Sequence, residues 1–252
     1  MRFKMISVVC VYNHQNILNE CLMKSLEFQN FDYELILVDN TKLKYESASQ
    51  ALNNAVRKAN GKYIIFAHQD VYLKSEYTLR NVFKLLNSLK NIGVVGVAGK
   101  KINEKGLISN ITAGWPPEKA GTNFETSLKV QTVDECFFVI PKSVFKINRF
   151  DEDVCDGWHF YAVDYCLSVM KMGLNIYLIP LELYHKSIGY SFNKDYYSIL
   201  KKLILKHRED YDMINTTTEN WSTKIPLFLQ INFKRAVWMM ILVKKRFLRH
   251  ES

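Results

Sequence analysis

The sequence predicts an α/β fold in which helices flank a mostly parallel central sheet. Short apolar runs rich in β-branched residues alternate with segments of helical periodicity through the first hundred residues. Each apolar run also ends abruptly in polar residues. Because helical crossovers join strands that run in the same direction, these polar endings should gather at one edge of the sheet, where α/β proteins bind ligands.

The N-terminal half contains four predicted strands separated by three predicted helices. The apolar runs are typical of strands buried on both faces, and the segments between them repeat apolar residues at helical spacing. The second helix ends at Asn60 and Gly61, a common C-terminal signal. The strands are expected at 6–11, 34–38, 61–70 and 93–99, and the helices at 18–26, 48–59 and 79–89.

The C-terminal half is predicted to be more varied. An apolar strand is expected at 133–141 and a further strand at 174–180. Beyond residue 187 the composition becomes aromatic and basic, with a helix expected within 190–211 and a hinge at 215–220.

Composition limits the classes of function. The chain has 252 residues, of which 48% are hydrophobic, enough for one sizeable core with a smaller appendage. Its net charge of +9 suits anionic partners such as nucleotide phosphates, nucleic acid or an acidic membrane surface. The five cysteines show no zinc or redox spacing, and no secretory leader is evident, so reduced thiols and a cytoplasmic location are expected.

The polar strand endings are the strongest functional signal. The third strand ends in His68, Gln69 and Asp70, and a carboxylate at that position can hold a hard divalent cation that in turn holds phosphates. The other endings supply amide, phenol and carboxylate groups to the same edge. They are Tyr12, Asn13, Asp39 and Asn40.

Several motifs, in order and at compatible spacing, resemble those of the family-2 glycosyltransferases, whose fold is the Rossmann-like GT-A fold. Val11-Tyr12-Asn13 resembles the loop after the first strand of that family, and Asp39-Asn40 resembles the end of its second strand. Asn53 keeps the register of the following helix. His68-Gln69-Asp70 falls where the family carries Asp-x-Asp, a variant that suggests a bacterial branch. The resemblance covers residues 5 to about 190.

This resemblance implies an inverting enzyme that moves a sugar from a nucleotide-sugar donor, a UDP-sugar by preference, to a saccharide or lipid-linked saccharide acceptor in bacterial surface polysaccharide synthesis. It also implies a Mn²⁺ or Mg²⁺ cofactor. Asp70 and His185 are the expected metal ligands. The expected donor-binding residues are Val11, Tyr12, Asn13, Asp39, Asn40, Asn53, His68 and Gln69.

The acceptor side departs from the family pattern. Where most members carry Glu-Asp before Asp164, this chain has Tyr161-Ala162. Inverting transfer needs a carboxylate to accept the proton of the attacking hydroxyl. Asp156 and Asp164 are the two candidates from the sequence, with Asp156 slightly favoured as base and Asp164 as a group that organises the site. Trp158 and His159 are candidates for a sugar-binding platform.

The resemblance and the change in composition together predict the domain organisation. Residues 1–190 would form the catalytic domain, with a nucleotide-binding half at 1–100 and an acceptor half at 101–190. Residues 191–252 would form a basic amphipathic helical extension. Within it, 226–249 combines large apolar residues with cations, which suits peripheral contact with the acidic inner face of the cell membrane.

Three other interpretations remain open at this stage. The missing acidic pairs are compatible with a catalytically inactive GT-A scaffold. A nucleotidyltransferase would share the fold, but such enzymes usually open with a glycine-rich loop, which Tyr12-Asn13-His14 lacks. A nucleic-acid-binding module is motivated only by the charge, because the sequence has no motif of that class, and no nucleic-acid partner is expected.

Overall fold

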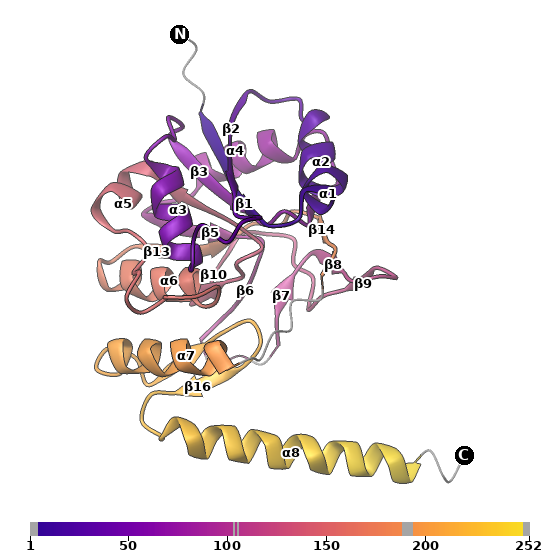
Figure 1. The fold of residues 1–252 in the computed structure, drawn as a ribbon, viewed down its shortest axis with the longest axis vertical. Coiled ribbons are helices and arrows are strands. Elements are labelled where there is room, and N and C mark those ends of the chain that lie inside the picture. Colours follow the sequence, from indigo (N-terminus) through magenta and orange to yellow (C-terminus); the bar gives the residue numbers. More distant parts are fainter. Residues whose placement is uncertain (1–4, 103, 105, 188–193, 249–252) are drawn as a thin grey trace.

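The fold is built on a seven-stranded sheet with helices on both faces (Figure 1). The computed structural model describes residues 5–102, 104, 106–187 and 194–248. The strand order is β10-β13-β5-β12-β3-β1-β2, and only β10 and β12 run antiparallel to their neighbours. These strands are β1 (Ile6–Tyr12), β2 (Tyr33–Asp39), β3 (Tyr63–Ala67), β5 (Ile92–Gly96), β10 (Leu128–Lys129), β12 (Phe137–Pro141) and β13 (Asn175–Leu178). The predicted α/β fold with a mostly parallel sheet is therefore confirmed.

Alternation along the strands divides the core into two layers. In β3, Ile64 and Phe66 belong to one apolar cluster, whereas Tyr63 and Ile65 belong to the other. The first cluster includes residues of α3, α5, α6 and α7, and the second includes residues of the α1–α2 run and α4. The helices are α1 (Gln15–Leu18), the π-helical η1 (Asn19–Met23), α2 (Lys24–Glu27), α3 (Ala48–Val56), α4 (Thr78–Ser88), α5 (Lys142–Ile147), α6 (Tyr161–Lys171), α7 (Lys194–His207) and α8 (Leu227–Leu248).

Gly61, between α3 and β3, allows the chain to pass very close to the backbone of β1. A Cβ on Gly61 would lie 2.5 Å from the backbone nitrogen of Ser7, so only glycine allows this close approach. The Gly61 amide donates to Ser7 Oγ at 2.8 Å, and Ser7 Oγ donates to Glu34 of β2. The three parallel strands are thus fixed together at the end opposite the ligand-binding edge.

Besides a two-stranded hairpin near the C-terminus, a four-stranded and a three-stranded sheet accompany the main one. The sheet β4-β14-β8-β9 matters for the site, because its antiparallel register pairs His185 with Val71, directly after Asp70. These strands are β4 (Val71–Leu73), β8 (Ile111–Ala113), β9 (Glu118–Lys119) and β14 (Leu183–His185). The other sheet contains β6 (Ala98–Lys100), β7 (Ile108–Ser109) and β11 (Thr132–Val133).

Two predicted strands are each divided into two elements. The expected strand 93–99 forms β5 and β6 of different sheets, and the expected strand 133–141 forms β11 and β12. Between β11 and β12, the Asp134 carboxylate accepts a hydrogen bond from the Cys136 amide at 2.9 Å, which stabilises a turn. This turn brings Asp134 and Glu135 out of the sheet.

The predicted hinge at 215–220 is wrong. A β-hairpin is formed there by β15 (Met213–Asn215) and β16 (Asn220–Ser222). Asn215 and Gln131 are linked by two hydrogen bonds, of 2.7 and 2.8 Å, and Trp221 is buried in the same core cluster as α6 and α7. The core therefore continues through residue 221, because the hairpin satisfies its own backbone groups and covers apolar side chains.

Helix α8 packs against the core over a smaller part of its length than the other long helices do. It contacts the body mainly near its start, where Gln230 donates to the carbonyl groups of Ser222 and Ile225 and Leu227 packs against the core. The remainder extends along the end of the molecule away from the N-terminus (Figure 1). No helix in the described part of the chain is both long and apolar enough to cross a bilayer.

Candidate active site

A pocket of about 380 Å³ opens at the carboxyl ends of β1 and β3. The loops after β1, β2 and β3 supply most of its polar groups, and Trp158 and the start of α6 close another side. Among the predicted donor-binding residues, Val11, Tyr12, Asn13, Asn40, His68 and Gln69 line it. The strand endings have therefore come together as the parallel topology required.

Gln69 joins two of these loops. Its Oε1 accepts hydrogen bonds from the backbone amides of Asn13 and His14, at 3.1 and 2.9 Å. Its Nε2 donates to Asn13 Oδ1 at 2.7 Å. The middle residue of the His-Gln-Asp motif thus fixes the loop after β1 to the turn after β3.

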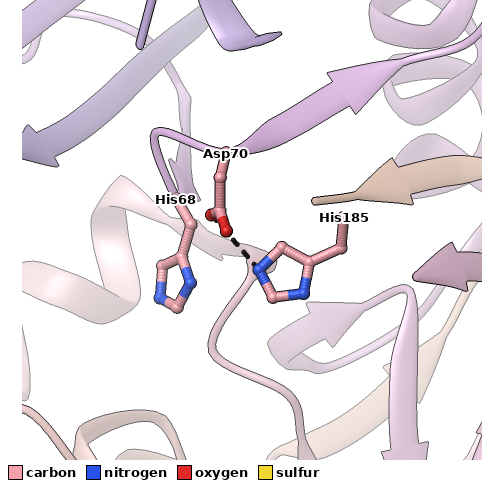
Figure 2. Close-up of side chains that lie close together, drawn as sticks. All are labelled: His68, Asp70 and His185. Atoms are coloured by element: carbon pink, nitrogen blue, oxygen red, sulfur yellow. Dashed lines mark ion pairs between the residues drawn. The ribbon is translucent and has the colours of Figure 1, made fainter. Parts of the chain in front are cut away.

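Three side chains form a candidate cation site beside the pocket (Figure 2). The possible ligand atoms of His68, Asp70 and His185 lie within 4.8 Å of one another. His68 and Asp70 come from the turn after β3, while His185 ends β14. The carboxylate lies between the two imidazoles, with Asp70 Oδ1 3.2 Å from His185 Nε2. Two ring nitrogens and a carboxylate oxygen are a donor set that fits a divalent transition-metal ion.

The electrostatics of this cluster keep Asp70 ionised. Burial alone would raise the pKa of Asp70, but the hydrogen bond and charge of His185 hold that pKa well below its usual range. Burial likewise opposes the charged form of His185, yet the Asp70 carboxylate raises the pKa of that imidazole. For His68, burial followed by repulsion from His185 lowers the pKa. His68 is thereby favoured in the neutral form that can bind a metal ion.

Neighbouring groups orient these side chains. His68 Nε2 lies 3.0 Å from the hydroxyl of Tyr161, the first residue of α6. Ser187 donates its backbone amide to Asp70 Oδ2 at 3.2 Å, and Ser187 Oγ lies 3.2 Å from His185 Nε2. Such outer partners hold possible metal ligands in place.

At the end of β2, the two predicted donor-binding residues have different environments. Asp39 is exposed, and hydrogen bonds from the Thr41 hydroxyl and amide lower its pKa. Asp39 does not line the pocket, although Tyr12 of the pocket is its register partner. Asn40 is buried and bonds the backbone of Tyr45 through both side-chain atoms, which fixes the loop that leads into α3.

The two predicted acceptor residues lie in separate cavities. Trp158 is 43% exposed and lines the main pocket. His159 lines a neighbouring cavity of about 110 Å³, together with His185 and the hairpin turn at 216–218.

Besides Asp39, three predicted site residues lie outside both cavities. Asn53 is buried and bonds the backbone of Phe150 at 2.9 and 3.2 Å, so it connects α3 to the segment after α5. Asp156 is exposed and forms an ion pair with Lys202 of α7. Asp164 is buried between α6 and α7, where it pairs with His207 and Lys206 at 2.8 Å. The helical register turns Asp164 towards α7 and away from the pocket.

The sequence interpretation missed Glu135. This half-buried carboxylate lines both cavities, and its Oε1 accepts a hydrogen bond from the Ala162 amide at 3.3 Å. Burial, followed by repulsion from Asp134, raises the pKa of Glu135 to about 8. The available signal was an acidic pair directly before an apolar strand, which is also a common surface feature.

Comparison with known proteins gives a consistent assignment. The model of a family described as "Glycosyltransferase like family" matches residues 7–195. The poly(ribitol-phosphate) beta-glucosyltransferase of Bacillus spizizenii is 28% identical in an alignment of 227 positions that covers 77% of this chain. The chain spans only 32% of the length of that relative.

Solved structures share the fold at low sequence identity. The mannosyltransferase PcManGT of Pyrobaculum calidifontis, in complex with GDP-Man and Mn²⁺, has a TM-score of 0.55 and 13% identity, with 83% of this chain and 66% of that chain covered. S. aureus TarS 1-349 in complex with UDP-GlcNAc has a TM-score of 0.54 and 16% identity, with 81% and 66% covered.

Proposed function

Since the chain belongs to the glycosyltransferase-like family, we propose that it transfers a sugar from a nucleotide-sugar donor, a UDP-sugar by preference, to a saccharide or lipid-linked saccharide acceptor. The observation that carries this proposal is the His68, Asp70 and His185 cluster at the edge of the main pocket. In an α/β fold, a nucleotide at this edge would place its phosphates next to that cluster.

His68, Asp70 and His185 would hold a divalent cation. Carboxylate oxygen suits both Mg²⁺ and Mn²⁺, whereas two imidazole ligands favour the transition metal, so Mn²⁺ is the preferred ion. Bound there, the cation would supply positive charge beside the diphosphate leaving group.

The chain's own residues would bind and orient the donor. The loop after β1 is fixed by Gln69, and its Tyr12 and Asn13 would contact the base and ribose of the donor. Trp158 offers an aromatic face, which suits the apolar face of a sugar ring. The family resemblance supports inversion at the anomeric carbon.

Titration calorimetry with UDP, in the presence and absence of Mn²⁺, tests this proposal. We expect UDP to bind at least 10-fold more tightly with Mn²⁺. In a separate turnover assay, one of several UDP- and GDP-sugars should release its nucleoside diphosphate. Binding without release from any donor would indicate a nucleotide-binding scaffold. Absence of UDP and GDP binding under both conditions would contradict the proposed function.

We also propose that α8 rests on an anionic membrane surface, which would bring a lipid-linked acceptor within reach. Its exposed residues include Phe228, Phe233, Trp238 and Met239, each more than 60% exposed. The sequence from 234 to 249 adds lysine and arginine residues, which complement acidic headgroups.

Co-sedimentation of the full chain with vesicles tests the role of α8. We expect the protein to sediment with phosphatidylglycerol vesicles at low salt and to remain in solution with phosphatidylcholine vesicles. The double variant Phe233→Ser and Trp238→Ser should lose most of this binding while keeping UDP affinity. Equal sedimentation of this variant and the wild type would contradict the proposal.

A further inference from the structure

The two cavities of the site meet at a carboxylate. The main pocket suits the donor, and the smaller cavity of about 110 Å³ lies beside it. His68 and Glu135 line both cavities, and of these two only Glu135 carries a carboxylate. A group at this junction can contact molecules in both spaces.

The smaller cavity has the chemistry of a site for hydroxyl-rich ligands. The hairpin turn between β15 and β16 contributes Thr216, Thr217 and Thr218, and His159 and Asp134 add further polar groups. These hydroxyl, imidazole and carboxylate groups can donate and accept hydrogen bonds with a polyol. The C-terminal hairpin thus forms part of the catalytic face.

Glu135 also lies against the start of α6, where the expected acidic pair is missing. Positions 161 and 162 carry Tyr and Ala, yet the Ala162 amide donates to Glu135 Oε1 at 3.3 Å. The residue before α6, Phe160, has a left-handed φ of 66° and makes no side-chain cap. A carboxylate from the turn after β11 therefore approaches the helix start at which positions 161 and 162 carry none.

We propose that Glu135 is the catalytic base of this transferase and that the acceptor hydroxyl enters through the smaller cavity. The inference rests on the proposed sugar transfer. Glu135 would take the proton of the acceptor O–H, while that oxygen forms a bond to the anomeric carbon. The bond between the anomeric carbon and the phosphate oxygen breaks with its electron pair remaining on the diphosphate.

The surroundings of Glu135 support this role. Burial, followed by repulsion from Asp134, raises the pKa of Glu135, whereas the amides at the start of α6 lower it, with a net value of about 8. A base with a pKa near the working pH accepts protons effectively. The other titratable groups that line the two cavities are His68, His159, His185, Asp70, Tyr12, Tyr161 and Tyr196.

A purely structural alternative is that Glu135 only caps α6. The variant Glu135→Gln separates the two roles, because the amide oxygen can still accept the Ala162 amide but the side chain can no longer accept a proton. UDP release from a UDP-sugar with water as acceptor measures the chemical step, and titration with UDP and Mn²⁺ measures donor-site binding. Glu182→Gln, at an exposed position, is the matched control.

We expect Glu135→Gln to lower kcat at least 100-fold, as for loss of a general base, with the Kd for UDP within twofold of wild type. The rise of wild-type activity between pH 6 and 8 should be absent in the variant, since only the ionised Glu135 accepts a proton. Retained kcat, or a loss of UDP affinity equal to the loss of kcat, would show that Glu135 is structural and overturn the inference. UDP binding by the wild type tests the proposed function separately.

Discussion

Two aspartate–histidine pairs in this chain use the same chemistry in different surroundings. Asp70 and His185 lie 3.2 Å apart, with 15% and 11% of their side chains exposed, at the edge of the pocket. Asp164 and His207 lie 2.8 Å apart, with 2% and 1% exposed, between α6 and α7. Lys206 joins the second pair, whereas His68 joins the first.

The comparison shows that two features decide whether an aspartate–histidine pair can bind a cation. They are the third side chain that joins the pair and the exposure of the pair to solvent. In the buried pair, Lys206 supplies the positive charge that Asp164 needs, so the cluster is complete as an internal ion pair. In the pocket pair, a second imidazole supplies a further lone pair instead of a permanent charge. That arrangement suits an added cation.

The largest effect should come from Asp70→Asn. Loss of the central charged ligand should lower UDP release from the donor about 1,000-fold, corresponding to about 4 kcal/mol of transition-state stabilisation. Turnover assays with Mn²⁺ measure this effect, and urea unfolding measures the folded fraction, since loss of the Asp70–His185 ion pair should also lower the free energy of unfolding. Activity within 10-fold of wild type would remove Asp70 from the proposed site.

Asp164→Asn should lower stability more than activity. It removes the buried carboxylate that contacts both Lys206 and His207 and leaves Lys206 with the partly exposed Asp151, so the free energy of unfolding should fall by about 3 kcal/mol. Urea denaturation measures this loss. At a temperature where the variant is folded, donor hydrolysis should stay within about fivefold of wild type, and a 100-fold loss would restore Asp164 as a catalytic candidate.

A smaller effect is expected for Tyr161→Phe, which removes the hydroxyl 3.0 Å from His68 Nε2. The affinity for Mn²⁺ should fall about 10-fold, since outer partners orient metal ligands. Titration of UDP binding with Mn²⁺ measures the change. The isosteric Tyr165→Phe, on the same helix and bonded to Asn148, provides the control, and equal Mn²⁺ affinities in the two variants would contradict the prediction.

The smallest effect should come from Asp156→Asn. Asp156 pairs with Lys202 on the surface, where an ion pair contributes at most about 1 kcal/mol. Urea unfolding should detect little change, and donor hydrolysis should stay within twofold of wild type. A large loss of kcat would favour the base originally predicted from the sequence over Glu135.

The sequence predicted the parts of the site that depend on local pattern. Apolar runs ending in polar residues located the edge formed by Tyr12, Asn13, His68 and Gln69, because parallel topology follows from strand–helix alternation. The sequence could not show that the side chains of Asp156 and Asp164 lie outside the pocket. A helix turns by about 100° per residue, so the direction of the Asp164 side chain depends on which face of α6 packs against α7.

The sequence by itself therefore determined the α/β fold and the His-Gln-Asp ending of β3, since both arise from residues that are neighbours in the chain. Only the tertiary structure brought His185 next to Asp70, through the register of β14 with β4, and Glu135 to the start of α6. It also placed the hairpin of β15 and β16 beside the site. These contacts join residues separated by tens of positions, and their geometry comes from packing between elements.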